Sequence, residues 1–182
     1  QGAMIGFLSS SQQIFEHVFG AADIFAFCFA FVAIGMAVAN FTNSRIVERF
    51  GARRVSQTAN ILFILLAAIQ FGASYWFPAS LPIFLVLLTG NMAFMGFIGS
   101  NFGSIAMQPF GAFAGTASSF QNFVRSVISV GIGGLIGHSF EGSVAPIIAG
   151  FFLCGVASLL FVLWGERGKL FTRPGTTRHM PL

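Results

Sequence analysis

Residues Val55 to Val124 read VSQTANILFILLAAIQFGASYWFPASLPIFLVLLTGNMAFMGFIGSNFGSIAMQPFGAFAGTASSFQNFV, a stretch without a single Asp, Glu, Lys or Arg. A water-exposed surface of that length would carry charged side chains. The whole chain of 182 residues is 55% hydrophobic and only 8% charged, about a third of the charged fraction of soluble domains. The composition therefore excludes an ordinary water-soluble protein and predicts that much of this chain lies in lipid.

Across the whole chain, uncharged apolar windows predict five complete membrane spans, because a helix needs roughly 20 apolar residues to cross a bilayer. The spans cover residues 24–44, 56–76, 81–99, 116–137 and 143–164, and the main connections are 45–55, 77–80, 100–115 and 138–142, with a tail at 165–182. Gly2 to Leu8 is apolar but too short to cross, so residues 1–10 are expected to end a further helix. The predicted fold class is an all-α, polytopic transmembrane helix bundle.

The distribution of basic residues predicts the orientation of this bundle. Eight of the nine basic residues fall in two segments on one side: Arg45, Arg49, Arg53 and Arg54 in the 45–55 loop, and Arg167, Lys169, Arg173 and Arg178 in the tail. The connections on the other side hold none, so the positive-inside rule places the loop and the C-terminus in the cytoplasm. The net charge of +4 then reflects membrane orientation, and we expect no nucleic-acid partner.

Two stripes of small and polar residues predict close helix packing, since association in lipid depends on small residues at the contact. The first span carries Ala26, Ala30, Ala33, Ala37, Asn40 and Ser44 along one helical face. The fourth carries Gly115, Ser119, Asn122, Ser126, Ser129, Gly133 and Gly137. Gly133 and Gly137 have the GxxxG spacing that suits a close crossing.

Arg125 is the candidate functional residue of the chain. It lies nine residues into the fourth span, about 13 Å deep at 1.5 Å per residue, where an arginine costs about 3 kcal/mol. The guanidinium should therefore face a polar cavity or a carboxylate, beside Gln121 and Asn122. The alternative is that Arg125 snorkels to the headgroups or fastens two helices together.

Two uncharged polar residues lie inside other spans. Asn91 lies in the third span and Gln70 in the second, and each is either a cavity residue or part of an interhelical hydrogen bond worth roughly 0.6 kcal/mol. Cys28, Cys154 and the three histidines stand apart from one another, so we expect no metal, no cofactor and no catalytic residues. The chain is not expected to be an enzyme.

Several stretches resemble the major facilitator superfamily. Ser44 to Arg54, SRIVERFGARR, resembles the G-x-x-x-D-R-x-G-R-R loop between the second and third helices of each six-helix half, with Ser44 and Glu48 replacing the first glycine and the aspartate, and Ala52 at an arginine position. Asn101 to Gln121, NFGSIAMQPFGAFAGTASSFQ, is similar to the drug:proton antiporter branch of bicyclomycin-resistance type. Residues 137–142 and 165–171 are similar to the last loop and tail of such efflux proteins.

This resemblance implies the second six-helix half of a major facilitator fold. The end of helix seven would be 1–10, the five spans would be helices eight to twelve in order, and 165–182 would be the cytoplasmic tail. The N-terminal six-helix half would be missing. The implied location is a bacterial inner membrane that the chain crosses several times.

The resemblance also implies a secondary transporter that exports small lipophilic compounds or drugs by proton antiport and alternating access. Arg125, Gln121, Asn122 and Asn91 would line the cavity. Glu48, Arg49, Gly51, Arg53 and Arg54 would gate or brace the cytoplasmic side. All five acids, Glu16, Asp23, Glu48, Glu141 and Glu166, fall in connections or at span ends, so the proton-coupling carboxylate is expected in the missing half and this piece alone should be inactive. The alternatives are a facilitator-type transporter of a polar or anionic metabolite, and a non-transporting membrane scaffold.

Overall fold

The structure is a computed structural model and describes residues 1–140 and 142–165. Within these ranges it forms six α-helices and no strand: α1 Gly2–Gln13, α2 Phe25–Phe50, α3 Ala52–Trp76, α4 Leu81–Met107, α5 Ala114–His138 and α6 Ala145–Gly165. Glu141, Glu166 and the four basic residues of the tail lie outside the described residues, as does most of the 165–171 likeness. The all-α helix bundle predicted from the sequence is confirmed.

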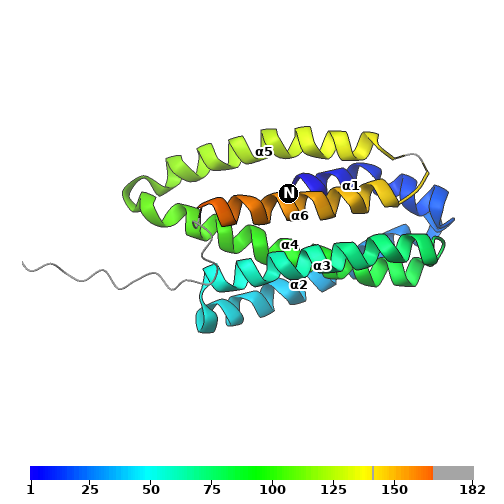
Figure 1. The fold of residues 1–182 in the computed structure, drawn as a ribbon, viewed down its shortest axis with the longest axis horizontal. Helices are drawn as coiled ribbons and strands as arrows, with labels where there is room; N and C mark the ends of the chain where they lie inside the picture. The colour runs from blue at the N-terminus through cyan, green and yellow to red at the C-terminus, as the bar shows by residue number, and fades with distance from the viewer. Residues whose placement is uncertain (141, 166–182) are drawn as a thin grey trace, which may run out of the picture.

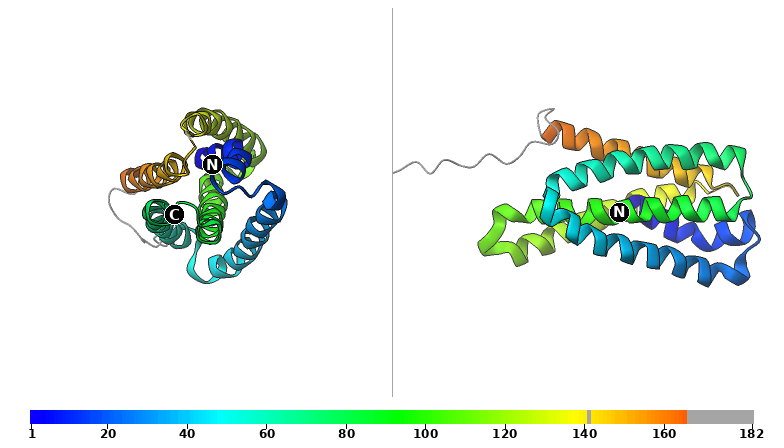
Figure 2. Two further views of the ribbon diagram at one scale, coloured as in Figure 1. Left: turned by 90° about the vertical axis from the view of Figure 1, so that its right-hand side faces the viewer. Right: turned by 90° about the horizontal axis from the view of Figure 1, so that it is seen from below.

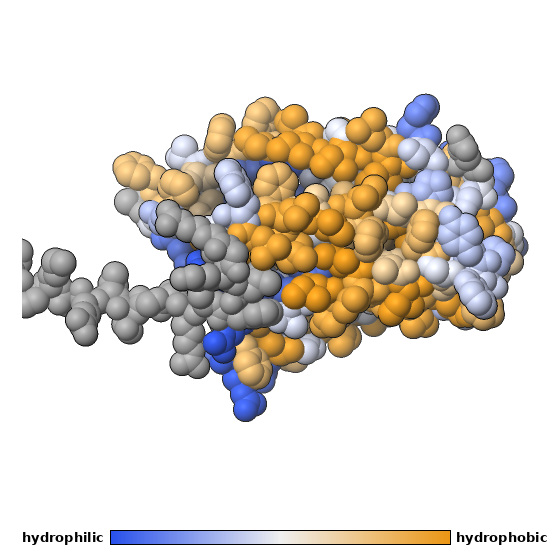
Figure 3. Space-filling model, viewed as in Figure 1, coloured by the Kyte–Doolittle hydropathy of each residue, from blue (hydrophilic) through white to orange (hydrophobic). Residues whose placement is uncertain are grey.

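Four of these helices are long and apolar enough to cross a membrane by length and composition: Ala22–Phe50, Ala52–Trp76, Leu81–Gly111 and Ala145–Gly165. Helix α5 has 25 residues, which is long enough, but it is not among the four because Arg125 and several Ser, Gln and Asn residues lower its hydropathy. Figure 3 shows an apolar band across the middle of the bundle and hydrophilic residues gathered toward its two ends. This surface is that of a multi-pass membrane protein.

The helices lie roughly parallel to a common long axis, and the connections alternate between the two ends (Figure 1). The α2–α3 turn, the α4–α5 connection and the end of α6 lie at one end, and the other connections lie at the opposite end. Helix α1 begins midway along the bundle, as the N label in Figure 1 shows. Viewed down the axis in Figure 2, α1 and α5 form a close pair beside α6, while α4 packs between α2 and α3.

The predicted 45–55 connection is much shorter in the structure. Helix α2 continues to Phe50 and α3 begins at Ala52, so Gly51 alone separates them, at a φ of 83°. Glycine adopts such a positive φ without a steric cost from Cβ. The expected connection was longer because the hydropathy windows end where charge begins, whereas the helices themselves continue through the arginines.

The connection predicted at 100–115 is also mostly helical. Helix α4 runs to Met107 and is followed by a 3-10 helix, Gln108–Phe113, in which Phe110 has non-helical dihedral angles. Pro109 lacks a backbone N–H and disfavours helical geometry in the residue before it. The proline explains why the α-helix ends here rather than at the edge of the apolar window.

At the opposite end, α1 does not finish at residue 10. It continues to Gln13 and then into a π-helix, Ile14–Val18, followed by a short 3-10 helix, Ala22–Ile24, before α2. Ile14 and Phe15 in the π-helix are buried. The ring of Phe15 lies 5.3 Å from that of Phe25 and 6.2 Å from that of Phe84, both edge-on. These aromatic contacts join the first helices to α4, which explains why the helical chain continues past the apolar window.

The GxxxG spacing at Gly133 and Gly137 marks a close crossing, as predicted, and the partner is α1. A Cβ atom at Gly133 would lie 3.0 Å from the carbonyl oxygen of Gly2 and 2.6 Å from Cγ2 of Ile5. Gly6 has the reciprocal relation to Ile136, whose Cβ would be 2.8 Å from an added Cβ. Only residues without a side chain allow backbones this near each other.

The alanine stripe predicted on the first span does not face a helix of the described chain. Ala26, Ala30, Ala33 and Ala37 are exposed on α2. A neighbouring face carrying Cys28, Val32 and Asn43 is buried instead, and α4 is the main partner of this helix. The spacing of the small residues identified a helix face without large side chains. It did not indicate whether another helix packs against that face.

Candidate functional site

Two cavities adjoin beside the first residues of α1. The larger, which we call the α5–α6 cavity, has a volume of about 970 Å³ and is lined mainly by α5 and α6, with the end of α4. The smaller, which we call the inner cavity, has a volume of about 280 Å³ and receives residues from all six α-helices. Gln1, Arg125, Cys154 and Ser158 line both. The size of the larger cavity is that of small-molecule sites.

Arg125 lies where these cavities adjoin, in keeping with the expectation that its guanidinium faces a cavity. Its Nη2 donates a hydrogen bond to Oδ1 of Asn122, one helical turn earlier, at 3.2 Å. Both side chains are exposed in the described chain, and no acidic residue is among those lining either cavity. The arrangement leaves a cation facing a large and mainly apolar space.

The other predicted cavity residues divide into two groups. Gln121 lines the α5–α6 cavity together with Arg125, and Asn122 reaches this group through its hydrogen bond. Asn91 is fully buried between α3 and α4, where its Nδ2 donates to Oε1 of Gln70 at 2.6 Å. The structure thus brings Gln121, Asn122 and Arg125 together and places Asn91 elsewhere. A cavity role for Asn91 stays a prediction.

Gln70 and Asn91 are joined by only one hydrogen bond. Nε2 of Gln70 and Oδ1 of Asn91 are buried and have no hydrogen-bond partner. An unpartnered polar group in a buried setting costs about 1–3 kcal/mol. The pair therefore fastens α3 to α4 less strongly than its short contact distance suggests.

Two polar residues of the inner cavity, Asn60 and Ser158, were not predicted from the sequence. Asn60 on α3 donates from Nδ2 to Oγ of Ser158 on α6 at 3.3 Å, while its Oδ1 is buried and unpartnered. Asn60 is 1% exposed and lines the inner cavity, so this carbonyl oxygen is an acceptor for a hydrogen-bond donor bound there. An asparagine inside an apolar window was the available signal, the same signal that singled out Asn91.

The residues of the predicted cytoplasmic motif gather around the α2–α3 turn. The Arg45 guanidinium lies 5.3 Å from the ring centroid of Phe41, and the Arg49 guanidinium lies 5.5 Å from that of Phe50. Glu48 is exposed, and Arg53 and Arg54 are half-buried at the start of α3. Gly51 forms the turn itself. The structure thus assembles Glu48, Arg49, Gly51, Arg53 and Arg54 at one end of the bundle, about the single-residue connection.

The described residues hold no group of three or more His, Cys, Asp or Glu side chains that could bind a metal ion. Cys28 is buried on α2 and Cys154 lies half-buried on α6, and neither forms a disulfide. Among the described residues, the polar side chains that line the two cavities include those of Arg125, Gln121, Asn60, Ser129 and Ser158.

Comparison with known proteins gives a match over most of the chain. Over 166 residues the chain is 28% identical to the bicyclomycin resistance protein homolog of Haemophilus influenzae. The match covers 87% of this chain and 40% of the relative, so the chain spans less than half the length of that protein. No family model matches the chain, and no solved structure does. The name of the relative agrees with the bicyclomycin-resistance likeness that the sequence motifs indicated.

Proposed function

We propose that this chain is the C-terminal half of a secondary transporter that exports small lipophilic compounds or drugs. The observation that carries the proposal is the α5–α6 cavity of about 970 Å³, which is mainly apolar and has Arg125, Gln121 and Ser129 in its lining. Ligand sites combine an apolar lining with a few polar groups that orient the ligand. An ionisable residue within a membrane-spanning bundle is a functional candidate by default, and the name of the relative points to drug resistance.

The transport cycle that we propose is alternating access driven by protons. Arg125 keeps its proton in proteins, so it cannot carry the coupling proton. Among the described residues, Glu16, Asp23 and Glu48 lie at the ends of helices rather than within the bundle. We therefore propose that the coupling carboxylate belongs to an N-terminal six-helix half of the longer protein.

The same N-terminal half would cover surfaces that the described chain leaves open. The exposed alanine stripe of α2 and the exposed residues Ser119, Asn122 and Ser126 of α5 have the small, polar character of helix contacts in lipid. Two halves that meet along these helices would enclose the cavity beside Arg125. The bundle would lie in a bacterial inner membrane, with the Gly51 turn and the C-terminus in the cytoplasm.

A second candidate function is the transport of a polar or anionic metabolite. It is favoured by the absence of acidic residues from the lining of both cavities, because an arginine without a carboxylate partner attracts an anion. In this alternative Arg125 is the residue that binds the charged group of the substrate.

The decisive experiment is a chimaera in which residues 1–182 replace the matching region of the Haemophilus influenzae relative. Export of a lipophilic dye is measured in cells that lack their own efflux pumps. We expect the chimaera to lower dye accumulation at least threefold, and residues 1–182 alone to have no effect. A chimaera that reaches the membrane in normal amount but exports nothing would contradict the proposal.

Two variants of the chimaera distinguish the candidate substrates. If Arg125→Gln abolishes export of anionic compounds and spares cationic dyes, Arg125 binds the anion and the second candidate holds. If export of every compound falls together while Arg125→Lys restores it, a positive charge in the cavity is required for the cycle itself. Val130→Ala, an exposed position on the same helix that lines neither cavity, serves as the matched control.

A further inference from the structure

We propose that the α2–α3–α4 groove at the arginine-rich end of the bundle is a binding site for an anionic phospholipid, with the phosphate at Arg54 and an acyl chain in the groove. This inference rests on the membrane bundle and does not depend on the transport activity proposed above. None of the residues that line the groove belongs to the α5–α6 cavity or the inner cavity.

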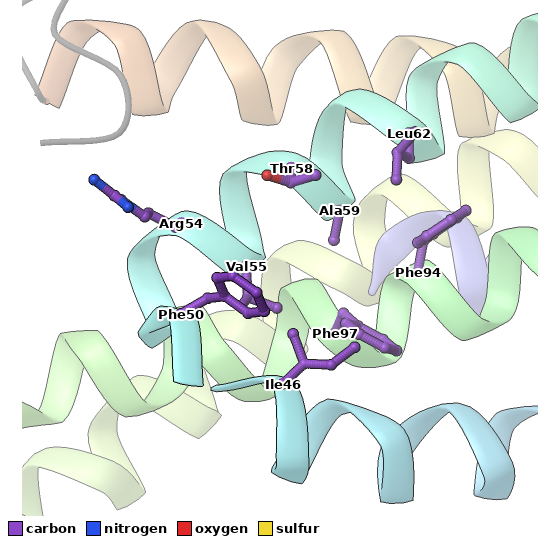
Figure 4. Close-up of a pocket in the computed structure, with 9 residues that line it drawn as sticks. All are labelled: Ile46, Phe50, Arg54, Val55, Thr58, Ala59, Leu62, Phe94 and Phe97. Atoms are coloured by element: carbon purple, nitrogen blue, oxygen red, sulfur yellow. The ribbon is translucent and has the colours of Figure 1, made fainter. Parts of the chain in front are cut away.

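The groove has a volume of about 610 Å³ and lies between the end of α2, the start of α3 and the middle of α4. Apart from Arg54 and Thr58, its lining is apolar, with Ile46 and Phe50 from α2, Ala59 and Leu62 from α3, and Phe94 and Phe97 from α4. Figure 4 shows these side chains converging on a common space. A trough of this size and lining accepts a hydrocarbon chain.

Arg54 gives the groove a charged end. In Figure 4 its guanidinium points away from the apolar side chains, while Leu62 and Phe94 lie at the far end. Nε of Arg54 is buried and has no hydrogen-bond partner. A buried cationic donor without an acceptor is costly, and a phosphate oxygen provides the charge-assisted hydrogen bond that arginine geometry favours.

The charges around the groove select an anion rather than a zwitterion. The α2–α3 turn region, residues 45–54, contains four arginines and a single acid, Glu48. The arginines are Arg45, Arg49, Arg53 and Arg54. The guanidinium groups of Arg45 and Arg49 lie over the rings of Phe41 and Phe50, which keeps positive charge close to the groove. No acidic residue lines the groove.

A phospholipid is the occupant that matches both ends of the groove. Helices α2, α3 and α4, which line the groove, are all long and apolar enough to span the membrane. Basic pockets between transmembrane helices at the anionic leaflet bind lipid headgroups in this way. A free phosphate would satisfy Arg54 and leave the apolar trough empty, and a soluble apolar ligand would leave the guanidinium unpaired.

The test measures lipid selectivity at the groove in residues 1–182, reconstituted in phosphatidylcholine vesicles. Trp76 and Trp164 are both exposed at helix ends, and replacing them by Phe removes the background fluorescence. A single reporter, Phe97→Trp, then lies in the groove, and its quenching by brominated phosphatidylglycerol is compared with that by brominated phosphatidylcholine. We expect about a fivefold preference for phosphatidylglycerol, the factor that corresponds to one basic residue near an anionic lipid.

Matched variants assign that preference to Arg54 and to the groove. Arg54→Gln should lower the ratio toward one, and Arg54→Lys should retain most of it. Arg45→Gln, an exposed arginine near the groove but outside its lining, should lower the ratio less than Arg54→Gln does. Thr58→Phe, which fills the groove without altering charge, should reduce quenching by both lipids. A reporter on the outward face of α6, Leu160→Trp, should have a ratio near one.

Three outcomes would overturn the proposal. Equal ratios for the Phe97→Trp and Leu160→Trp reporters would mean that the groove holds only ordinary surrounding lipid. If the preference for phosphatidylglycerol persisted in Arg54→Gln, the phosphate would not bind Arg54. A Phe97→Trp reporter that no lipid quenches would mean that another part of the protein fills the groove.

Discussion

Asn43 on α2 and Asn101 on α4 hydrogen-bond to each other in both directions. Nδ2 of Asn101 donates to Oδ1 of Asn43 at 3.0 Å, and Nδ2 of Asn43 donates to Oδ1 of Asn101 at 3.4 Å. Both side chains are buried, and Nδ2 of Asn43 also reaches Oγ of Ser100 at 3.1 Å. This reciprocal pair fastens two helices at the end of the bundle where the arginines gather.

The first prediction concerns this pair. Asn43→Leu should destabilise the protein, because it leaves the amide of Asn101 buried without its partner. The coupling free energy between the two positions should be about 0.6 to 1.7 kcal/mol, the range found for interhelical hydrogen bonds in membranes. A double-mutant cycle of Asn43→Leu and Asn101→Leu, measured by reversible unfolding in bicelles, gives this value, and strictly additive effects would show that the bonds contribute nothing.

The second prediction concerns the α1–α5 crossing. Gly133→Ala should cost about 1–3 kcal/mol, the usual cost of overpacking, because its Cβ would meet the Gly2 carbonyl oxygen and the Ile5 side chain. Gly131→Ala is the matched control, since an added Cβ there has no neighbour within 4 Å. It should not destabilise the protein, because alanine is favoured over glycine inside a helix by up to about 1 kcal/mol. Thermal unfolding in detergent checks both, and equal effects would contradict the close crossing.

A third prediction follows from the half-satisfied pair of Gln70 and Asn91. Asn91→Leu alone should destabilise by about 1–3 kcal/mol, because Gln70 would lose its single bond in a buried site. The double variant Gln70→Leu/Asn91→Leu should recover most of that loss, since it removes both unpartnered amide atoms of the pair. Unfolding free energies of the three variants decide the matter: a double variant less stable than either single one would show that the amides are bonded more fully than the structure indicates.

The fourth prediction addresses the insertion of α5. Arg125→Leu should improve membrane insertion of the isolated α5 segment by about 3 kcal/mol on translocon scales. Ser126→Leu, at the adjacent position, should give less than half of that improvement. Glycosylation mapping in microsomes measures the inserted fraction. If the two substitutions raised the inserted fraction equally, the Arg125 guanidinium would not be the cause of the lower hydropathy that distinguishes α5 from the four apolar helices.

A fifth prediction tests water access to the α5–α6 cavity in the chimaera. In a background without Cys28 and Cys154, Gln121→Cys should react with a membrane-impermeant maleimide, because this position lines the cavity. Phe27→Cys, on an exposed apolar position of α2, should face lipid and stay unlabelled. Labelling yield is read by gel shift. A cavity position sealed from the reagent in both orientations of the vesicle would contradict a water-filled pathway.

The helices were predictable because their signal is local. Each predicted window lies within an observed helix, apart from one or two end residues, since a run of apolar residues reports directly on burial in lipid. The ends of the helices were less predictable. Hydropathy falls at Arg45, for example, while the backbone remains helical to Phe50. Only a positive φ at Gly51 and the proline at position 109 mark where the helices stop.

The partners of the helices could not be read from the sequence. The spacing of Gly133 and Gly137 predicted a close helix contact. The residues of α5 did not indicate that its partner is α1. Likewise, Ala26 and Ala30 resembled a contact face, although Cys28 and Val32 on the adjacent face are the buried residues. Asn91 and Arg125 are both polar residues inside apolar spans, and the sequence did not distinguish their surroundings. In the structure Asn91 is buried against Gln70, whereas Arg125 lines both cavities.

The single-residue link at Gly51 also constrains how the bundle can move. Because both neighbours of Gly51 are helical, the connection contains no additional residues that could extend. An axial shift of α2 would therefore also displace the first turn of α3. A movement of α2 at this end of the bundle would thus be transmitted directly to α3, because no flexible loop lies between them.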